Sequence, residues 1–133
     1  MFVIALAARG AGATQAAATT TVKDKVYTKE QAARGQALFE KVCSKCHALD
    51  DKASTLEGPS LAGEDFLKRW DGKPVFDFAF GIKVKMPPDG SVTMDDDSTA
   101  DAVAFILESN TFPAGDKPLT TGESSRTVMF VTK

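Results

Sequence analysis

Hydrophobic side chains recur every three to four residues after Thr28, which predicts an amphipathic helix. Thr28 and Gln31 have the three-residue spacing of a capping box, so we expect the helix to begin at this threonine. The periodic positions are Ala32, Gly35, Phe39, Val42, Cys43 and Cys46. The helix is therefore predicted to run into the two cysteines, and the glycine- and proline-containing stretch 48–64 that follows is predicted to be a loop.

Another helix is predicted after the three aspartates Asp95–Asp97. Carboxylates suit the N-cap and the first turn, because the N-terminus of a helix carries a partial positive charge. The apolar face of this helix lies within Ala102–Leu107, and Asn110 with Pro113 ends it. A shorter helix is expected over Asp65–Trp70.

The segment between these two helices fits two structures. Alternate residues are apolar, which is the pattern of a half-buried strand. A helix through the same segment would also have an apolar face. The alternating set is Phe76, Phe78, Phe80, Ile82, Val84 and Met86, and the helical set is Val75, Phe78, Ala79 and Ile82. The local pattern alone favours the strand.

The two ends of the chain are predicted to lie outside the main domain, which we expect over residues 27–119. Phe2–Ala8 is apolar but far shorter than the roughly 20 residues that span a bilayer. Small residues follow up to Ala18, so residues 1–26 are interpreted as a signal peptide and a flexible lead-in, although no Lys or Arg precedes the apolar run. Residues 120–133 form a polar tail with one apolar stretch, Val128–Val131, which could dock as a strand or stay loose.

Composition excludes one large class of function. The 133 residues suffice for one domain, and 16 Lys and Arg against 18 Asp and Glu give a net charge of −2. A general nucleic-acid binder needs a clear basic excess, so we expect no nucleic acid as a partner. The chain has one histidine, His47, and two cysteines, Cys43 and Cys46.

Cys43, Cys46 and His47 form the pattern C-x-x-C-H, which is the attachment site of a c-type haem. Two thiols three residues apart on a helical turn face the same side, so both can add across the vinyl groups of one porphyrin. The adjacent histidine then lies beneath the iron, where a neutral imidazole is a good axial ligand. One motif predicts one haem.

Three other uses of these residues fit less well. A structural zinc site needs four ligands, and the chain has only three Cys or His residues. A disulfide between Cys43 and Cys46 would close a very small loop and leave His47 without a role. A thioredoxin-like C-x-x-C motif is expected in a βαβ unit, whereas a helix leads into this one.

Further residues accompany the haem motif: Gly35, Phe39, Gly58–Gly63, Trp70, Met86-Pro87-Pro88, Ala102–Leu107 and Phe112–Asp116. Together they resemble the short class I cytochromes c, in particular the small soluble monohaem cytochromes of bacteria. The resemblance implies an all-α, cytochrome c-like fold of three to five helices around one covalently bound haem c. It also implies a helix over residues 75–85, against the local alternation.

The resemblance implies that Met86 is the second axial ligand. A residue before proline favours extended conformations, and Pro87 with Pro88 stiffens this loop. Met94 is the alternative, although its place directly before Asp95 suits an apolar residue that packs at a helix start. A second histidine ligand is excluded, because the chain has a single histidine.

Other positions are implied to support the haem. Pro59 would offer its backbone carbonyl to the Nδ1–H of His47, which orients the ring and makes it electron-rich. Trp70 would donate its indole N–H to a haem propionate or pack in the haem pocket. Gly35 and Phe39 are expected to meet the last helix near Phe105, where glycine lets two backbones approach closely.

A haem with two protein ligands has no open coordination position, so we expect a one-electron carrier and not an enzyme. It would be a periplasmic monomer that shuttles between a donor dehydrogenase or complex and an oxidase or reductase. Redox proteins would dock at the haem edge, and membrane contact would occur only through partners or an uncleaved N-terminus. Candidates for a basic rim at this edge are Lys41, Lys45, Lys83 and Lys85.

Two other functions stay open from the sequence. Without Met86 on the iron, a five-coordinate haem could bind gases or peroxide, which would make the protein a sensor or an enzyme. Alternatively, the chain could be a tightly bound cytochrome subunit of a dehydrogenase.

Overall fold

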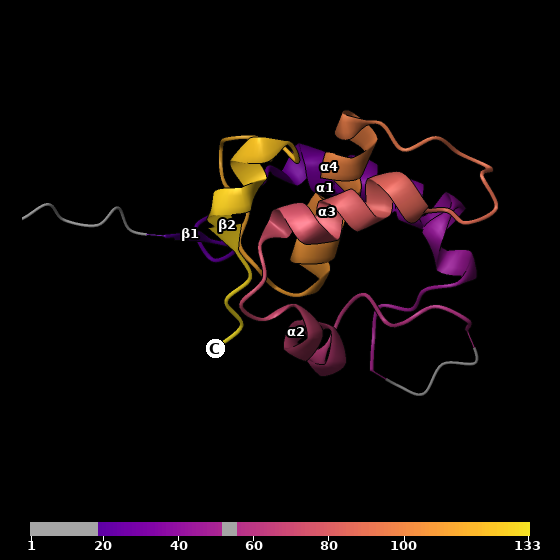
Figure 1. Cartoon of the computed structure of the whole chain (residues 1–133), viewed down its shortest axis with the longest axis horizontal. Coiled ribbons are helices and arrows are strands. Elements are labelled where there is room, and N and C mark those ends of the chain that lie inside the picture. Colours follow the sequence, from indigo (N-terminus) through magenta and orange to yellow (C-terminus); the bar gives the residue numbers. More distant parts are fainter. Residues whose placement is uncertain (1–18, 52–55) are drawn as a thin grey trace, which may run out of the picture.

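Four α-helices form most of the computed structural model, which describes residues 19–51 and 56–133. They are α1 (Lys29–Lys41), α2 (Glu64–Trp70), α3 (Val75–Lys85) and α4 (Asp96–Ser109). The remaining elements in these ranges are two 3₁₀ helices, η1 (Cys43–Lys45) and η2 (Glu123–Thr127), and two strands, β1 (Thr20–Thr21) and β2 (Val128–Met129) (Figure 1). The predicted signal peptide lies outside the described residues.

Side-chain caps set the starts of the two long helices. At α1, Gln31 N donates to Thr28 Oγ1 and Thr28 N donates to Gln31 Oε1, each at 3.2 Å. At α4, Ser98 N donates to Asp95 Oδ1 at 2.7 Å. Each cap satisfies backbone N–H groups that have no partner within the helix. Both predicted helix starts are confirmed.

Residues 75–85 form the helix that the family resemblance implied, so the strand favoured by the local pattern is wrong. Val75, Phe78 and Ala79 lie on the buried face of α3. Phe80 and Val84 are 53% and 55% exposed. Apolar residues therefore occur on two sides of one helix, and in sequence this arrangement imitates the alternation of a strand.

α1 crosses α4 at Gly35. A Cβ atom at this position would lie 1.8 Å from the carbonyl oxygen of Asp101 and 2.8 Å from Cβ of Phe105. One turn further along α1, the rings of Phe39 and Phe105 pack with centroids 5.4 Å apart. The predicted close approach of these helices is confirmed, and it depends on the missing side chain of glycine.

The two ends of the described chain pair with each other. β1 runs parallel to β2, and Val22 N donates to Met129 O at 3.0 Å. Val22 is fully buried, so the expected flexible lead-in is wrong for residues 20–26. The reason is tertiary: this segment gains its hydrogen bonds and apolar contacts from a tail more than 100 residues later in the chain.

The tail also closes one side of the helical core. Phe130 is fully buried, its N–H donates to Lys73 O at 2.9 Å, and its carbonyl accepts from Gly72 N at 2.8 Å. Figure 1 shows the tail in yellow beside the start of α3. The apolar stretch Val128–Val131 therefore docks on the domain, which was one of the two outcomes expected from its sequence.

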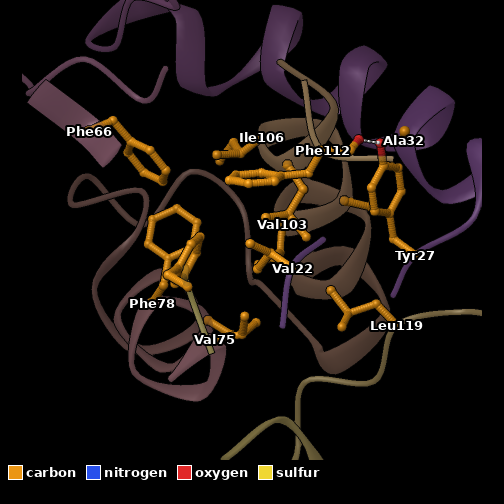
Figure 2. Packing of buried hydrophobic residues seen from close by; sticks show 14 residues of the cluster. Val22, Tyr27, Ala32, Phe66, Val75, Phe78, Val103, Ile106, Phe112 and Leu119 are labelled. Carbon is orange, nitrogen blue, oxygen red and sulfur yellow. Dashed lines mark hydrogen bonds between the residues drawn. The ribbon is translucent and has the colours of Figure 1, made fainter. Parts of the chain in front are cut away.

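The core lies between the helices and takes residues from all of these segments (Figure 2). Its buried members are Val22, Tyr27, Ala32, Phe66, Val75, Phe78, Ala79, Val103, Ala104, Ile106, Leu107, Phe112, Leu119 and Phe130. None of the helices within residues 19–51 and 56–133 has the length and apolar character needed to cross a bilayer.

Tyr27 provides a prediction about stability. Its hydroxyl donates to the carbonyl of Phe112 at 2.6 Å inside the core (Figure 2). Burial, and secondarily the negative charge of Glu108, raises the pKa of Tyr27. The proton is thus held more tightly in the folded state, so its contribution to stability is complete below the usual tyrosine pKa and is lost as the pH rises through the raised one.

We expect Tyr27→Phe to lower the free energy of unfolding at neutral pH by about 1–2 kcal/mol, because the Phe112 carbonyl loses its donor. The variant should also lose less stability than the wild type between neutral and alkaline pH. Denaturant unfolding at several pH values measures both effects. Tyr27 is the only tyrosine, so tyrosinate absorbance follows this group alone. Equal alkaline losses in the two proteins would contradict the prediction.

Candidate functional site

Both cysteines lie on a tight turn directly after α1. The N–H groups of Cys46 and His47 donate to the carbonyl of Cys43 at 3.1 and 3.0 Å. These bonds keep the three residues on a single turn. Both thiols are free and partly exposed, and burial raises the pKa of the Cys43 thiol. The turn therefore presents two free thiols three residues apart.

The imidazole of His47 is held from one side by the loop that follows. Its Nδ1 lies 2.7 Å from the carbonyl oxygen of Pro59. A carbonyl can only accept a hydrogen bond, so Nδ1 carries the proton of this bond, and in the neutral imidazole the lone pair then lies on Nε2. This tautomer is the one required for binding a metal through Nε2. The predicted contact between Pro59 and His47 is therefore present.

Gly58 lies directly against the same ring. A Cβ atom here would come within 2.5 Å of His47 Cε1 and 2.6 Å of Nδ1. The backbone of Gly58 also donates to the carbonyl of Cys46 at 2.8 Å. Any larger residue would displace the ring or the loop. The cysteine turn and the loop at Gly58 thus form one unit that fixes the direction of the imidazole.

Of the two candidate methionine ligands, Met86 is 37% exposed and Met94 is 5% exposed. Met86 ends α3 in an extended conformation, with φ −112° and ψ 143°, as expected for a residue before proline. Met94 packs in the interior directly before the N-cap Asp95, the place that suits an apolar packing residue. Burial therefore distinguishes the two candidates: the thioether of Met86 is accessible, and the thioether of Met94 is enclosed.

The loop after Met86 lies near the cysteine turn. Hydrogen bonds from Ser91 are the main cause that lowers the pKa of Asp89, and the positive charge of Lys45 lowers it further. Asp89 in this loop therefore lies near enough to Lys45 of η1 for the lysine charge to act on it. In Figure 1 the loop, in orange, and the turn after α1 lie at the same end of the molecule.

Trp70 belongs to an aromatic cluster at the end of α2. Its ring centroid is 4.8 Å from that of Phe78, 6.0 Å from Phe130 and 6.4 Å from Phe66. Lys73 Nζ also lies over the indole, 5.2 Å from its centroid. Trp70 therefore packs among aromatic side chains, and its packing against the haem stays a prediction. A bond from its indole N–H to a propionate stays a prediction.

The candidate basic rim is partly neutralised. Lys83 Nζ forms an ion pair with Asp96 Oδ1 at 2.6 Å, and both side chains are exposed. Lys45 lies close enough to Asp89 to influence its pKa. Lys45 and Lys83, two of the four candidate lysines, therefore have a carboxylate nearby, which weakens the case for a strongly basic docking face.

Two polar residues that support the site were missed by the sequence analysis. The carboxylate of Asp51 accepts hydrogen bonds from the backbone of Glu64 and Asp65 and so caps α2. The side chain of Asn110 bonds to the backbone of Leu61 and Gly63. Sequence separation explains both omissions, because each residue caps or bridges a segment more than ten positions away. Only the helix-ending role of Asn110 had a local signal.

Within the described ranges, no group of three or more His, Cys, Asp or Glu side chains is placed to hold a metal ion by itself. The residues around His47 fit a haem. They provide two free thiols on one turn and an imidazole with a free Nε2 lone pair, and Gly58 has no side chain that would displace the imidazole ring.

Comparison with known families defines the class of protein. The protein-family model described as cytochrome c oxidase, cbb3-type, subunit III matches residues 30–106, more than half of the chain. With the helical fold, this match defines a small c-type cytochrome. The chain belongs to the family of that model. A search of curated proteins found no match, and neither did a search of solved structures.

Membership of the family has direct consequences. The fold is the all-α, cytochrome c-like fold expected from the resemblance, and the cofactor is a covalently bound haem c. The family has an electron-carrier role, and such a protein works with redox partners.

Proposed function

We propose that this cytochrome is a periplasmic one-electron carrier in which Cys43 and Cys46 hold the haem and His47 and Met86 bind its iron. One observation carries the assignment of the site: His47 directly follows the second of two free thiols, and the Pro59 carbonyl holds its ring in the tautomer that leaves Nε2 available. Two thiols and an oriented imidazole on one turn match what covalent attachment and axial ligation require.

The bound haem supplies a one-electron iron couple. His47 would hold the iron through Nε2, and its bond to the Pro59 carbonyl would make the imidazole more electron-rich, which favours the oxidised iron. Met86 is the proposed sulfur ligand because it is accessible where Met94 is buried, and a thioether favours the reduced iron. The aromatic cluster around Trp70 is the proposed apolar wall of the pocket.

The proposed carrier is an exported monomer that accepts electrons from a periplasmic dehydrogenase or complex and passes them to an oxidase or reductase. Export agrees with the apolar start of the chain and with covalent haem attachment outside the cytoplasm in similar bacterial proteins. The ion pair between Lys83 and Asp96 reduces the positive charge near Met86, which favours weak contacts that release quickly. The expected partners are redox proteins that approach the haem edge.

A second candidate function is a tightly bound subunit of a larger redox complex. The description of the matching family favours it, because it names a subunit of a cbb3-type oxidase. Mild solubilisation of the source cells, followed by size-exclusion chromatography with detection of haem absorbance, separates the two. Elution as a monomer no larger than the full 14.1 kDa chain supports the free carrier. Stoichiometric elution with a larger complex supports the subunit.

Carbon monoxide tests the carrier against a five-coordinate sensor or enzyme. An iron with two protein ligands has no position for the gas, whereas an iron with one ligand binds it readily. We expect the spectrum of the dithionite-reduced protein to stay unchanged under carbon monoxide. A rapid, complete spectral shift would reject the proposed ligation by Met86 and favour gas binding.

A further inference from the structure

Asn110 is a buried amide whose hydrogen bonds leave its own helix. It is the C-cap of α4, and it is 7% exposed. Nδ2 donates to the carbonyls of Leu61 at 3.0 Å and Ile106 at 2.8 Å. Oδ1 accepts from Gly63 N at 3.0 Å. Both N–H groups and the carbonyl of the side chain therefore have partners, and two of these three partners belong to one distant loop.

That loop is the segment that holds His47. From Gly58 to Leu61 it bonds to the cysteine turn at three places: Gly58 N to Cys46 O at 2.8 Å, Leu61 N to Ala48 O at 2.9 Å, and the Pro59 carbonyl to His47 Nδ1 at 2.7 Å. The side chain of Asn110 bonds to the same loop from its other side, at Leu61, which lies two residues beyond Pro59. The Pro59 carbonyl is thus fixed between the histidine and the end of α4.

We propose that Asn110 is a positioning residue for the haem, which holds the Pro59 carbonyl at the distance that orients His47 and keeps its imidazole electron-rich. The inference rests on the proposed function, because it assigns His47 to the iron. Backbone bonds fix this loop to the cysteine turn on one side, and the side chain of Asn110 fixes it to the end of α4 on the other.

The alternative is that Asn110 only stabilises the fold. Gln31 supplies a matched control, because it is also a buried amide that bridges a helix to a loop. Its Nε2 donates to Leu119 O at 2.9 Å, and its Oε1 accepts from Leu119 N at 2.7 Å. Leu119 lies in the C-terminal part of the chain and has no place in the loop that holds His47. Loss of either amide leaves buried backbone groups without partners.

The experiment compares Asn110→Leu with Gln31→Met, each of which removes the amide and keeps a similar volume. Both variants should unfold at lower denaturant concentration than the wild type. Only Asn110→Leu should raise the reduction potential of the haem, because a weaker bond to Pro59 makes the imidazole a poorer donor to the oxidised iron. Hydrogen exchange at His47 Nδ1 should also accelerate in this variant by about tenfold or more, and not in Gln31→Met.

An unchanged potential and unchanged exchange in a folded Asn110→Leu protein would overturn the inference, and so would equal changes in both variants. If Asn110→Leu does not fold, hydrogen exchange in the wild type tests the inference. The Gly63 amide proton and the His47 ring proton should then exchange through the same opening of the loop, and exchange through independent openings would overturn the inference. A wild-type protein without haem would instead reject the proposed function, and the role of Asn110 with it.

Discussion

Met86→Leu is expected to remove the weak thioether-to-iron band at the red end of the oxidised spectrum and to open the reduced iron to carbon monoxide. Leucine has a similar size but no sulfur, so only the ligand changes. We expect the reduction potential to fall by on the order of 0.1 V, because axial ligands set haem potentials over roughly 0.8 V and a thioether favours the reduced iron. Spectroscopy and redox titration measure these effects.

Met94→Leu is the matched control. Met94 is 5% exposed and packs before α4, so a swap of similar volume should cost less than about 1.5 kcal/mol. Its spectrum and potential should stay those of the wild type. A protein that keeps the band after Met86→Leu and loses it after Met94→Leu would reverse the assignment of the ligand.

Gly35→Val is expected to cause a large loss of stability at the crossing of α1 and α4. Even the Cβ atom would lie 1.8 Å from the Asp101 carbonyl oxygen, which belongs to helix backbone and cannot turn aside. α1 and α4 would have to separate along their crossing. We expect a loss of about 3–5 kcal/mol in the free energy of unfolding, at the upper end of effects for single substitutions.

Gly35→Ala distinguishes packing from helix propensity. At an exposed position inside a helix, alanine gives a protein roughly 0.5–1 kcal/mol more stability than glycine does. We expect Gly35→Ala to destabilise the protein, because the overlap outweighs this gain. The control is Gly81→Ala in α3, where an added Cβ meets no atom within 4 Å and the protein should become slightly more stable. Guanidinium unfolding of both variants measures the difference. A stabilising effect at Gly35 would show that the helices do not cross as closely as described.

Local signals in the sequence predicted most of the helical framework. The capping box at Thr28 and the carboxylates at Asp95–Asp97 gave the starts of α1 and α4, because caps are short-range interactions that the sequence encodes directly. The family resemblance, and not the hydrophobic pattern, gave the helix at 75–85. Exposed Phe80 and Val84 made that pattern misleading.

Contacts between distant segments could not be predicted in the same way. Val22 has no local periodicity around it, and its burial depends on the tail that ends near Phe130. At the candidate site, the motif predicted Cys43, Cys46 and His47 but gave no sign of Asn110. The hydrogen bonds from this side chain reach a loop 47 and 49 residues earlier, so only the folded chain brings them together.

Mass spectrometry of the tryptic digest tests the proposed attachment most directly. Lys45 lies between the two cysteines, so trypsin separates the fragments 42–45 and 46–52. In protein from a host that can mature cytochromes c, we predict that one haem joins both fragments into a single species. Haem on one fragment only would contradict attachment through both cysteines, and two unmodified fragments from a colourless protein would contradict the account as a whole.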